Sequence, residues 1–272
     1  MASPRIAFQG ERGAYSEEAT RAFFGPGVEA VPCPSFRAVF EAVISGRVDG
    51  GVVPVENSLA GSVLDNVDLL LEFSVPLTGE LSLRIQHCLL APAGLGLADI
   101  RRVHSHPQAL AQCAGFLRQH GITPVADVDT AGSAKKVSEQ KPPNTGAIAS
   151  RTAAELYGLT VVQEGIQDGL NNYTRFISLG AVPKLSGSRS KTSVSFTLEN
   201  TPGALHALLG VFATRGLNVI RVEPRPLRRP WDYIFCLDLE GSSDEPRVGE
   251  ALDAASLLCG SFRVLGSYRV AD

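Results

Sequence analysis

The chain has 272 residues, of which 44% are hydrophobic and 19% charged, enough apolar content for one large domain or two smaller ones. Its formal net charge of -3 and its pI near 6.0 give no basic field that would attract nucleic acid. No apolar run approaches the roughly 20 residues that span a bilayer. The sequence therefore predicts a globular protein without a nucleic-acid or membrane partner.

The five cysteines lie far apart, and no two of them form a Cys-x-x-Cys pair. A disulfide framework or a zinc site would need closer, paired spacing. We therefore expect reduced thiols and a cytoplasmic protein. The first residues lead straight into an apolar strand, so we also expect no secretory signal.

Apolar segments of strand type alternate with helical patterns from the N-terminus. Strands are predicted at residues 5–9 and 51–55, and helices at 15–24 and 59–73. Ser35 is placed to cap a further helix, whose apolar face follows the i, i+3, i+4 spacing with Phe36, Val39, Phe40, Val43 and Ile44.

The alternation continues with strands at 102–105, 123–128 and 146–149 and helices at 107–120, 131–139 and 151–157. Such alternation predicts an α/β fold with largely parallel sheets. The two half-sheets are connected near residues 81–91 and 167–179. We therefore expect two lobes with a cleft between them.

The C-terminal part has its own pattern. Ser, Gly, Lys and Pro cluster without periodicity at residues 182–191, which is typical of a linker. Thr201 is then expected to cap a helix that Gly216 ends. The element order is βαββαβ, with strands at 192–199, 218–225, 232–239 and 261–270 and a second helix at 246–258. This order predicts a ferredoxin-like sandwich at residues 192–272, after a larger domain at 1–181.

Four segments that follow predicted strands carry polar side chains, and α/β proteins bind ligands at such strand ends. The first is the glycine loop 9–16, whose helix start offers free N–H groups to an anion; the alternative is a plain turn. It lacks the Lys-Ser/Thr of a phosphate-binding loop, so no nucleotide is expected. The second contains Glu56, Asn57 and Ser58, which contact a ligand, cap the next helix, or do both.

The third segment contains Ser105 and Gln108, and Ser133 stands at a nearby predicted helix start that suits an anion. His104 and His106 have the spacing of metal ligands, but no carboxylate or cysteine joins them locally. We therefore predict no metal site and two ordinary histidines.

The fourth segment, residues 171–176, leads into an apolar strand and contains Thr174 and Arg175. An arginine that is buried without a partner is costly, so we expect Arg175 to meet an anionic ligand. The alternative is an arginine whose side chain reaches water.

Together the four segments resemble the prephenate dehydratase family, and the resemblance extends over essentially the whole chain. The family's motifs stand here as Gly10-Glu11-Arg12-Gly13-Ala14-Tyr15-Ser16, Glu56-Asn57-Ser58-Leu59-Ala60-Gly61-Ser62, His104-Ser105-His106-Pro107-Gln108-Ala109-Leu110 and Thr174-Arg175-Phe176. The resemblance implies a two-lobed catalytic domain similar to periplasmic binding proteins, with the active site in the interlobe cleft. The catalytic residues that it implies are Thr174, Arg175 and Phe176, and the substrate-binding residues are Tyr15, Glu56, Asn57, Ser58, Ser105, Gln108 and Ser133.

The C-terminal domain resembles an ACT domain of the phenylalanine-binding kind, which implies L-phenylalanine as allosteric ligand and a homodimer or homotetramer. Two motifs carry this resemblance, each with one departure: His206 replaces the valine of Gly-Ala-Leu-Val, and Pro224 replaces the serine of Glu-Ser-Arg-Pro. The proline removes a hydroxyl and a backbone N–H. The expected effector contacts are Gly203, Ala204, Leu205, Asn218, Glu223 and Arg225. No helical chorismate mutase region precedes Arg5, so we expect a monofunctional enzyme.

The implied reaction converts prephenate into phenylpyruvate, water and CO₂ without a cofactor, because formation of the aromatic ring drives it. A cation on the departing carboxylate would stabilise the ground state more than the transition state. We therefore assign Arg175 to the side-chain carboxylate, which keeps its charge. The family resemblance makes Thr174 the catalytic hydroxyl, and we expect it to donate a hydrogen bond to the leaving oxygen. Asn57, Ser58 and the helix start at Ser133 are expected to line the site.

Three other functions would make different demands on the sequence. Arogenate dehydratase performs the same reaction on the aminated substrate, whose ammonium would favour a carboxylate neighbour such as Glu56. A non-catalytic amino-acid-binding sensor would have no need of Thr174 and usually carries an export signal. A DNA-binding regulator with an ACT sensor would require a basic recognition helix, which the sequence lacks.

Overall fold

The computed structural model describes residues 3–169, 171–183, 185, 187–227 and 229–271. The chain forms two compact units, of which the first comprises residues 1–63 and 82–176 and the second residues 64–81 and 177–272. The predicted linker, residues 182–191, includes Lys184 and Ser186, which lie outside the described residues. No helix within the described ranges is long and apolar enough to cross a membrane.

The first sheet of unit 1 is built on three parallel strands. β1 (Arg5–Gln9) lies between β2 (Glu29–Cys33) and β3 (Gly50–Asn57), and a short β4 (Gly61–Ser62) pairs antiparallel with the end of β3. The helices α1 (Tyr15–Phe24) and α2 (Phe36–Ile44) pack on these strands. The Ser35 hydroxyl accepts a hydrogen bond from the Ala38 N–H, which confirms the predicted cap.

The second sheet of unit 1 has the order β10–β6–β9–β7–β8. β7 is parallel to β8 and β9, whereas β6 is antiparallel to β9 and β10. The strands are β6 (Cys88–Ala91), β7 (Arg102–Ser105), β8 (Thr123–Ala126), β9 (Thr145–Ala149) and β10 (Thr160–Glu164). The helices are a short 3₁₀ turn η1 (Leu97–Asp99), α4 (Pro107–Gln112), α5 (Ala114–Gln119), α6 (Thr130–Gln140) and α7 (Arg151–Tyr157).

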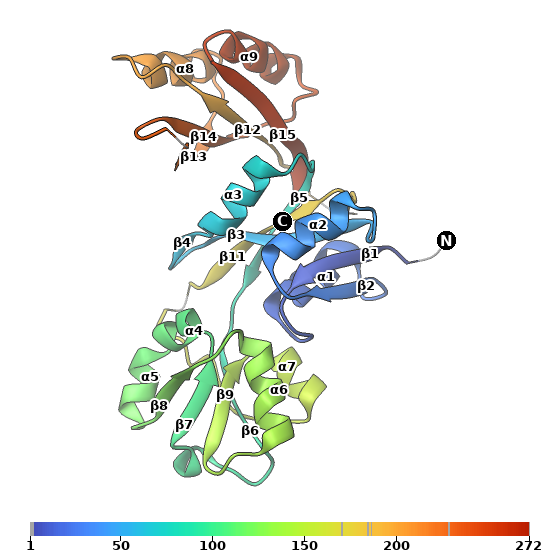
Figure 1. Cartoon of the computed structure of the whole chain (residues 1–272), viewed down its shortest axis with the longest axis vertical. Coiled ribbons are helices and arrows are strands. Elements are labelled where there is room, and N and C mark those ends of the chain that lie inside the picture. The colour runs from blue at the N-terminus through green and yellow to red at the C-terminus, as the bar shows by residue number, and fades with distance from the viewer. Residues whose placement is uncertain (1–2, 170, 184, 186, 228, 272) are drawn as a thin grey trace. The chain divides into compact units, whose positions relative to one another are not determined.

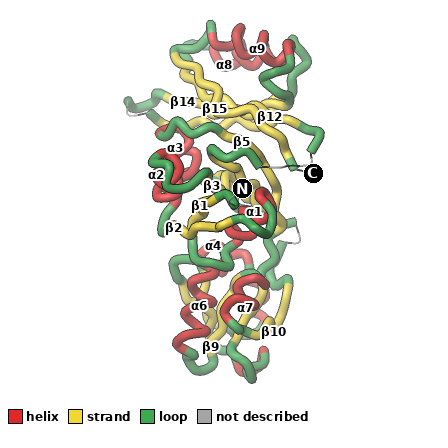
Figure 2. Tube along the Cα trace, turned by 90° about the vertical axis from the view of Figure 1, so that its right-hand side faces the viewer, coloured by secondary structure: helices red, strands yellow, loops and turns green. Residues whose placement is uncertain are grey.

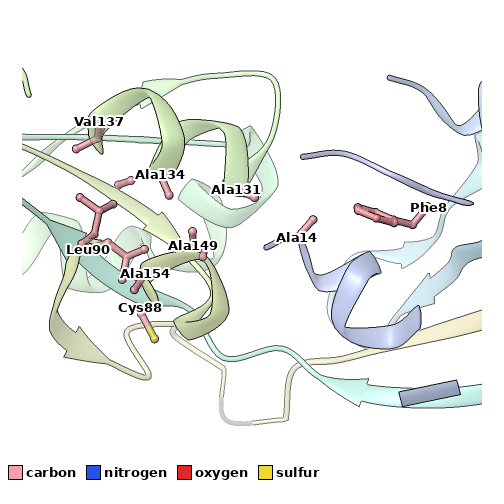
Figure 3. Close-up of a cluster of buried hydrophobic side chains, with 12 residues drawn as sticks. Phe8, Ala14, Cys88, Leu90, Ala131, Ala134, Val137, Ala149 and Ala154 are labelled. Atoms are coloured by element: carbon pink, nitrogen blue, oxygen red, sulfur yellow. The ribbon is translucent and has the colours of Figure 1, made fainter. Parts of the chain in front are cut away.

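Both faces of the second sheet are buried, and alternate residues of β6 divide between them. Leu90 belongs to a cluster with small side chains of α6 and α7, including Ala134 and Ala154, which gather around it (Figure 3). Leu89 belongs to the cluster that contains Leu110 of α4. A strand that is buried on both faces reads as an unbroken apolar run, as β6 does. Figure 2 shows α6 and α7 side by side on one face of this sheet.

The second unit contains the βαββαβ domain. Its antiparallel strands have the order β13–β14–β12–β15, and β5 (Leu77–Arg84) pairs parallel with β15. The elements are β12 (Ser190–Thr197), α8 (Ala204–Ala213), β13 (Val219–Pro226), β14 (Tyr233–Glu240), α9 (Pro246–Ser256) and β15 (Ser261–Val270). The helices α8 and α9 cover one face of the sheet (Figure 1), so the predicted ferredoxin-like sandwich is confirmed.

Helix α3 (Leu64–Glu72) lies on the other face of that sheet (Figure 1). Two arginines of the sheet bind it. Arg225 of β13 forms a two-pronged ion pair with Asp68, at 2.6 Å from Nε and 2.7 Å from Nη2. Arg263 of β15 donates from Nη2 to the carbonyl oxygens of Leu70 (2.9 Å) and Leu71 (3.0 Å). The second contact satisfies carbonyl groups at the C-terminal end of α3, which have no partner within the helix.

Two predicted helices differ from the observed ones. The helix predicted at 107–120 is interrupted at Cys113, because Asp168 satisfies the backbone groups on both sides of the break. The Asp168 N–H donates to the Gln112 carbonyl (2.7 Å), and its carboxylate accepts from the Gly115 N–H (3.0 Å). The helix predicted at 59–73 begins only at Leu64, because the preceding residues form β4.

The cap predicted at Thr201 is also wrong. Gly203 occupies that position, with a φ of +87° that favours glycine. The prediction of largely parallel sheets holds for the first sheet, whereas the second is mixed. Both β2 and β10 lie outside the predicted strands.

Candidate active site

The side chain of Asn57, at the end of β3, folds back onto the turn that follows it. Its Oδ1 accepts hydrogen bonds from the backbone N–H groups of Leu59 (3.1 Å) and Ala60 (3.0 Å). Asparagine commonly stabilises turns in this way. Asn57 therefore caps a turn into β4 instead of a helix, and its amide nitrogen is directed to other groups.

Ser58 ties this turn to the segment that enters β11 (Tyr173–Leu179). Its hydroxyl donates to the Asn171 carbonyl (2.7 Å) and accepts from the Tyr173 N–H (2.9 Å). The Ser58 N–H donates to the Tyr173 carbonyl (2.8 Å). Three hydrogen bonds thus join two segments that are more than 110 positions apart in the chain.

Thr174 is 9% exposed and lies beside the Asn57 amide. The Nδ2 of Asn57 donates to Thr174 Oγ1 (3.0 Å) and is shared with Asn172 Oδ1 (2.7 Å) and the Tyr173 carbonyl (3.1 Å). Because the turn fixes the orientation of the Asn57 amide, Thr174 Oγ1 must be the acceptor. A hydroxyl that accepts a bond keeps its own hydrogen, and no acceptor for that hydrogen is found among the described residues. The Thr174 hydroxyl therefore has a hydrogen that it can donate to a further acceptor.

Arg175 and Glu56 form an ion pair at 3.2 Å between Nη2 and Oε2. The arginine side chain is 12% exposed, whereas that of Glu56 is 41% exposed. The pair places a cation on the strand that carries Thr174 and a more accessible carboxylate on the strand that carries Asn57. Phe176, only 2% exposed, packs in the interior.

The glycine loop before α1 is shaped by packing against α7. Gly13 has a φ of +85°, and a Cβ atom there would lie 2.9 Å from the Cα of Ala153. The glycine is therefore explained by close helix packing. The hydroxyl of Tyr15, which follows the loop, lies 2.9 Å from the Gln86 carbonyl oxygen and 3.0 Å from Nδ1 of His87, and it can donate its one hydrogen to either. Burial raises the pKa of Tyr15 well above its usual value, so the phenol stays protonated.

The three other predicted substrate residues lie around the second sheet and are not brought to Thr174 by any hydrogen bond. The hydroxyl of Ser105, fully buried, donates to the Ile148 carbonyl (2.6 Å) of the neighbouring strand. Gln108 is exposed in the first turn of α4. Ser133 is buried in the first turn of α6 and donates to the backbone carbonyl of Asp129 (2.7 Å), whose carboxylate caps the helix.

A polar cavity of about 230 Å³ lies at this start of α6, with Ser133 in its wall. Its two lysines already have carboxylate partners, since Lys135 pairs with Glu11 (3.1 Å) and Lys136 with Asp127 (2.8 Å). With Asp129 and Glu139 also in the lining, four carboxylates face two lysines, and this excess of acidic groups does not favour an anionic ligand.

Two polar residues that the sequence analysis missed lie next to the Asn57 amide. Gln112, the last residue of α4, accepts at Oε1 from Nδ2 of Asn172 (2.9 Å) and donates from Nε2 to Asn57 Oδ1 (3.4 Å). Asn172 is fully buried. Helical spacing offered a signal, because Gln112 follows Gln108 by one turn in an otherwise apolar helix.

The predicted effector residues occupy two places in unit 2. Ala204 and Leu205 line a cavity of about 120 Å³ with the aromatic side chains of Trp231, Tyr233 and Phe235. Gly203 caps the helix that begins there, and the Asn218 carbonyl accepts from the Glu240 N–H (3.0 Å). Glu223 instead pairs with Arg221 (3.3 Å), and Arg225 with Asp68.

No group of three or more His, Cys, Asp or Glu side chains is arranged to hold a metal ion within the part of the chain that the structure describes. The Cys33, Cys88, Cys113 and Cys236 thiols are buried and Cys259 is partly buried. Burial raises the pKa of Cys113 and of Cys236 to about 12, which keeps these two thiols protonated.

Comparison with known proteins adds to this geometry. The profile described as prephenate dehydratase matches residues 6–184, and the ACT domain profile matches residues 192–256. An arogenate dehydratase/prephenate dehydratase 2, chloroplastic, from Arabidopsis thaliana is 44% identical over 278 residues, which cover 98% of this chain and 73% of the relative. Arogenate dehydratase 2 from Petunia hybrida is 43% identical over 281 residues, covering 97% of this chain and 71% of the relative.

Among solved structures, a prephenate dehydratase from Arthrobacter aurescens in complex with L-Phe superposes with a TM-score of 0.89. It is 33% identical, and the match covers 97% of this chain and 89% of that one. The similarity therefore extends across both the dehydratase and the ACT parts of the sequence.

Proposed function

Because the chain belongs to the prephenate dehydratase family, we propose that its own substrate is prephenate, which it converts to phenylpyruvate, CO₂ and water. The protein is an enzyme that joins a dehydratase domain to an ACT domain. We assign residues 1–181 to catalysis, 182–191 to a linker and 192–272 to regulation.

The chemistry breaks two bonds of the substrate ring. The bond to the ring carboxylate breaks, and its electron pair completes the aromatic ring as CO₂ departs. The bond to the ring hydroxyl breaks with its electron pair on oxygen, and the oxygen takes a proton from solvent to leave as water. Charge therefore grows on the leaving oxygen, where a fixed donor gives the greatest benefit.

The hydrogen bond from Asn57 to Thr174 carries this proposal. It fixes Oγ1 of Thr174 as an acceptor on one side, so that its O–H is free to donate to the leaving oxygen on the other. A neutral hydroxyl is a poor proton source, and its role is to stabilise negative charge by a hydrogen bond. Asn57 and Ser58 hold that hydroxyl in place.

Arg175 binds the side-chain carboxylate of the substrate, which keeps its charge throughout the reaction. The more exposed Glu56 can turn toward water when this carboxylate arrives, and the mostly buried guanidinium keeps its position. We also propose Tyr15 of α1 as a substrate-binding residue. The same role is proposed for three residues of the second sheet and its helices: Ser105, Gln108 and Ser133.

Arogenate is the second candidate substrate, and Glu56 is the observation that favours it. A half-exposed carboxylate beside Arg175 would suit a substrate that carries an ammonium next to its side-chain carboxylate. Two of the most similar relatives have arogenate dehydratase in their names.

Steady-state kinetics on both substrates test this choice. We expect kcat/KM to be at least about tenfold higher for prephenate, which corresponds to about 1.4 kcal/mol of transition-state binding. Phenylpyruvate absorbance should appear without added metal or nucleotide. A kcat/KM that favours arogenate would reassign the substrate, and Glu56→Gln should then reduce turnover of arogenate more than that of prephenate.

We place the regulatory site for L-phenylalanine at the start of α8. Support comes from the cavity there with its three aromatic side chains, and from the solved relative in complex with L-Phe. Phenylalanine bound between ACT domains of two subunits would favour one quaternary state. We therefore propose a homodimer or homotetramer. We also propose a cytoplasmic location, in keeping with the free thiols.

Addition of L-phenylalanine should raise the melting temperature and change the dehydratase rate, because a ligand that binds only the folded state stabilises it by mass action. At 100 times its Kd the ligand would contribute about 2.7 kcal/mol. Scanning fluorimetry and the phenylpyruvate assay measure the two effects, with D-phenylalanine as the control. A melting curve that does not change at millimolar L-phenylalanine would contradict the proposed effector site.

A further inference from the structure

A row of polar side chains, buried except for the half-buried Gln112, leads away from Thr174 and ends at His87, just before β6. Asn57 Nδ2 donates to Asn172 Oδ1 (2.7 Å), and Asn172 Nδ2 donates to Gln112 Oε1 (2.9 Å). The same Gln112 oxygen lies 2.9 Å from Nε2 of His87. His87 is 3% exposed, and the reaction as described makes no use of it.

The backbone sets the direction of every hydrogen bond in this row. Asn57 Oδ1 accepts from two backbone N–H groups, and its Nδ2 lies 3.1 Å from the Tyr173 carbonyl, so the amide has one possible orientation. Asn172 must then present its oxygen to Asn57 and its nitrogen to Gln112. The Gln112 oxygen must therefore face His87.

An amide oxygen can only accept a hydrogen bond, so Nε2 of His87 must carry a hydrogen. In the neutral ring the other nitrogen, Nδ1, can then only accept a hydrogen bond. It faces the Tyr15 hydroxyl at 3.0 Å and shares the single hydrogen of that hydroxyl with the Gln86 carbonyl (2.9 Å). Burial lowers the pKa of His87, which favours this neutral form. The Gln112 contact thus selects the tautomer with the hydrogen on Nε2.

We infer that His87 is a positioning residue for the reaction: its Nε2–H fixes the Gln112 amide, which through Asn172 and Asn57 fixes the hydroxyl of Thr174. This inference rests on the proposed role of Thr174 in dehydration. His87 does not touch the substrate. It completes a row in which each amide has a partner on both sides, and removal of the last donor leaves the Gln112 oxygen with one partner fewer in a half-buried place.

Replacement of His87 by leucine and by glutamine provides the test. Leucine removes the donor, whereas glutamine can place an amide N–H close to the former position of Nε2. We expect His87→Leu to lower kcat about 10- to 100-fold with little change in KM, because a small displacement of a catalytic donor affects the transition state more than substrate binding. His87→Gln should retain most of the rate.

A double-mutant cycle separates positioning from general damage to the fold. In a Thr174→Ala background the leucine substitution should have little further effect on kcat, because the group that His87 positions is already gone. Gln112→Met, which removes the oxygen from the row, should lower kcat as His87→Leu does, and the two should not add. His120→Leu is the matched control for loss of an imidazole outside the row.

Circular dichroism and melting curves establish that each variant is folded. An active wild-type enzyme with equal kcat in His87→Leu would overturn the inference and leave the proposed function intact. Equal losses of kcat in His87→Leu and His87→Gln would likewise overturn it. So would a loss of kcat from His87→Leu that adds to the loss from Thr174→Ala. Absence of dehydratase activity in the wild-type enzyme would instead contradict the proposed function.

Discussion

Replacement of Thr174 by alanine is expected to lower kcat by about 10²-fold or more, the usual cost of losing one fixed donor to a developing negative charge. The hydroxyl is buried, and Asn57 orients it from one side. KM should change little, because the bond to the leaving oxygen gains strength only as that oxygen departs. Steady-state assays with prephenate measure both constants.

Serine and valine are the matched controls for this position. Thr174→Ser keeps the hydroxyl and should retain most of the activity, whereas Thr174→Val keeps the shape and should lose about as much as alanine. In the valine variant the Asn57 amide loses one acceptor but keeps Asn172 Oδ1 and the Tyr173 carbonyl. If Thr174→Ala and Thr174→Val turned over prephenate at the wild-type rate, the assignment of this hydroxyl would be wrong.

Replacement of Arg175 by glutamine should lower kcat/KM about 10- to 200-fold, because hydrogen bonds to charged groups contribute about 1.5–3 kcal/mol. We expect the loss mainly as a higher KM, since the side-chain carboxylate has the same charge in the ground and transition states. Arg175→Lys keeps the charge but lacks the planar guanidinium, so its kcat/KM should lie between those of the wild-type enzyme and Arg175→Gln.

Glu56→Gln serves as the control for the partner of Arg175. It leaves the guanidinium in place and removes the competing carboxylate, so the KM for prephenate should not rise. A fall in kcat without a rise in KM in Arg175→Gln would indicate that the guanidinium acts on the departing groups, and would contradict the assignment to the side-chain carboxylate.

Elements whose limits are set by local signals could be predicted from the sequence. The strand at residues 5–9 and the helices at 15–24 and 151–157 have the predicted bounds, since glycine and serine mark their ends. The break at Cys113 could not be predicted in this way. It depends on Asp168, whose backbone and side chain satisfy the ends of two helices from a distant part of the chain.

The residues of the site likewise divide into those that local motifs predict and those that only the tertiary structure reveals. Asn57, Ser58 and Thr174 were singled out from motifs, and the structure joins them by hydrogen bonds. Gln112 and His87 were missed, because only tertiary structure brings them into the row behind Asn57. Glu223 and Arg225 were predicted as effector contacts from a motif, and their ion pairs with Arg221 and Asp68 depend on neighbours that no local pattern reveals.

The attachment of α3 has a mechanical consequence. Arg225 pairs with Asp68 in the middle of α3, and Arg263 donates to carbonyl groups at the C-terminal end of α3. The helix is therefore bound to the strands β13 and β15, which carry these arginines. Leu64, the first residue of α3, comes only seven positions after Asn57. The stretch of chain between this helix and the turn at Asn57 is therefore short, with only six residues between Asn57 and Leu64.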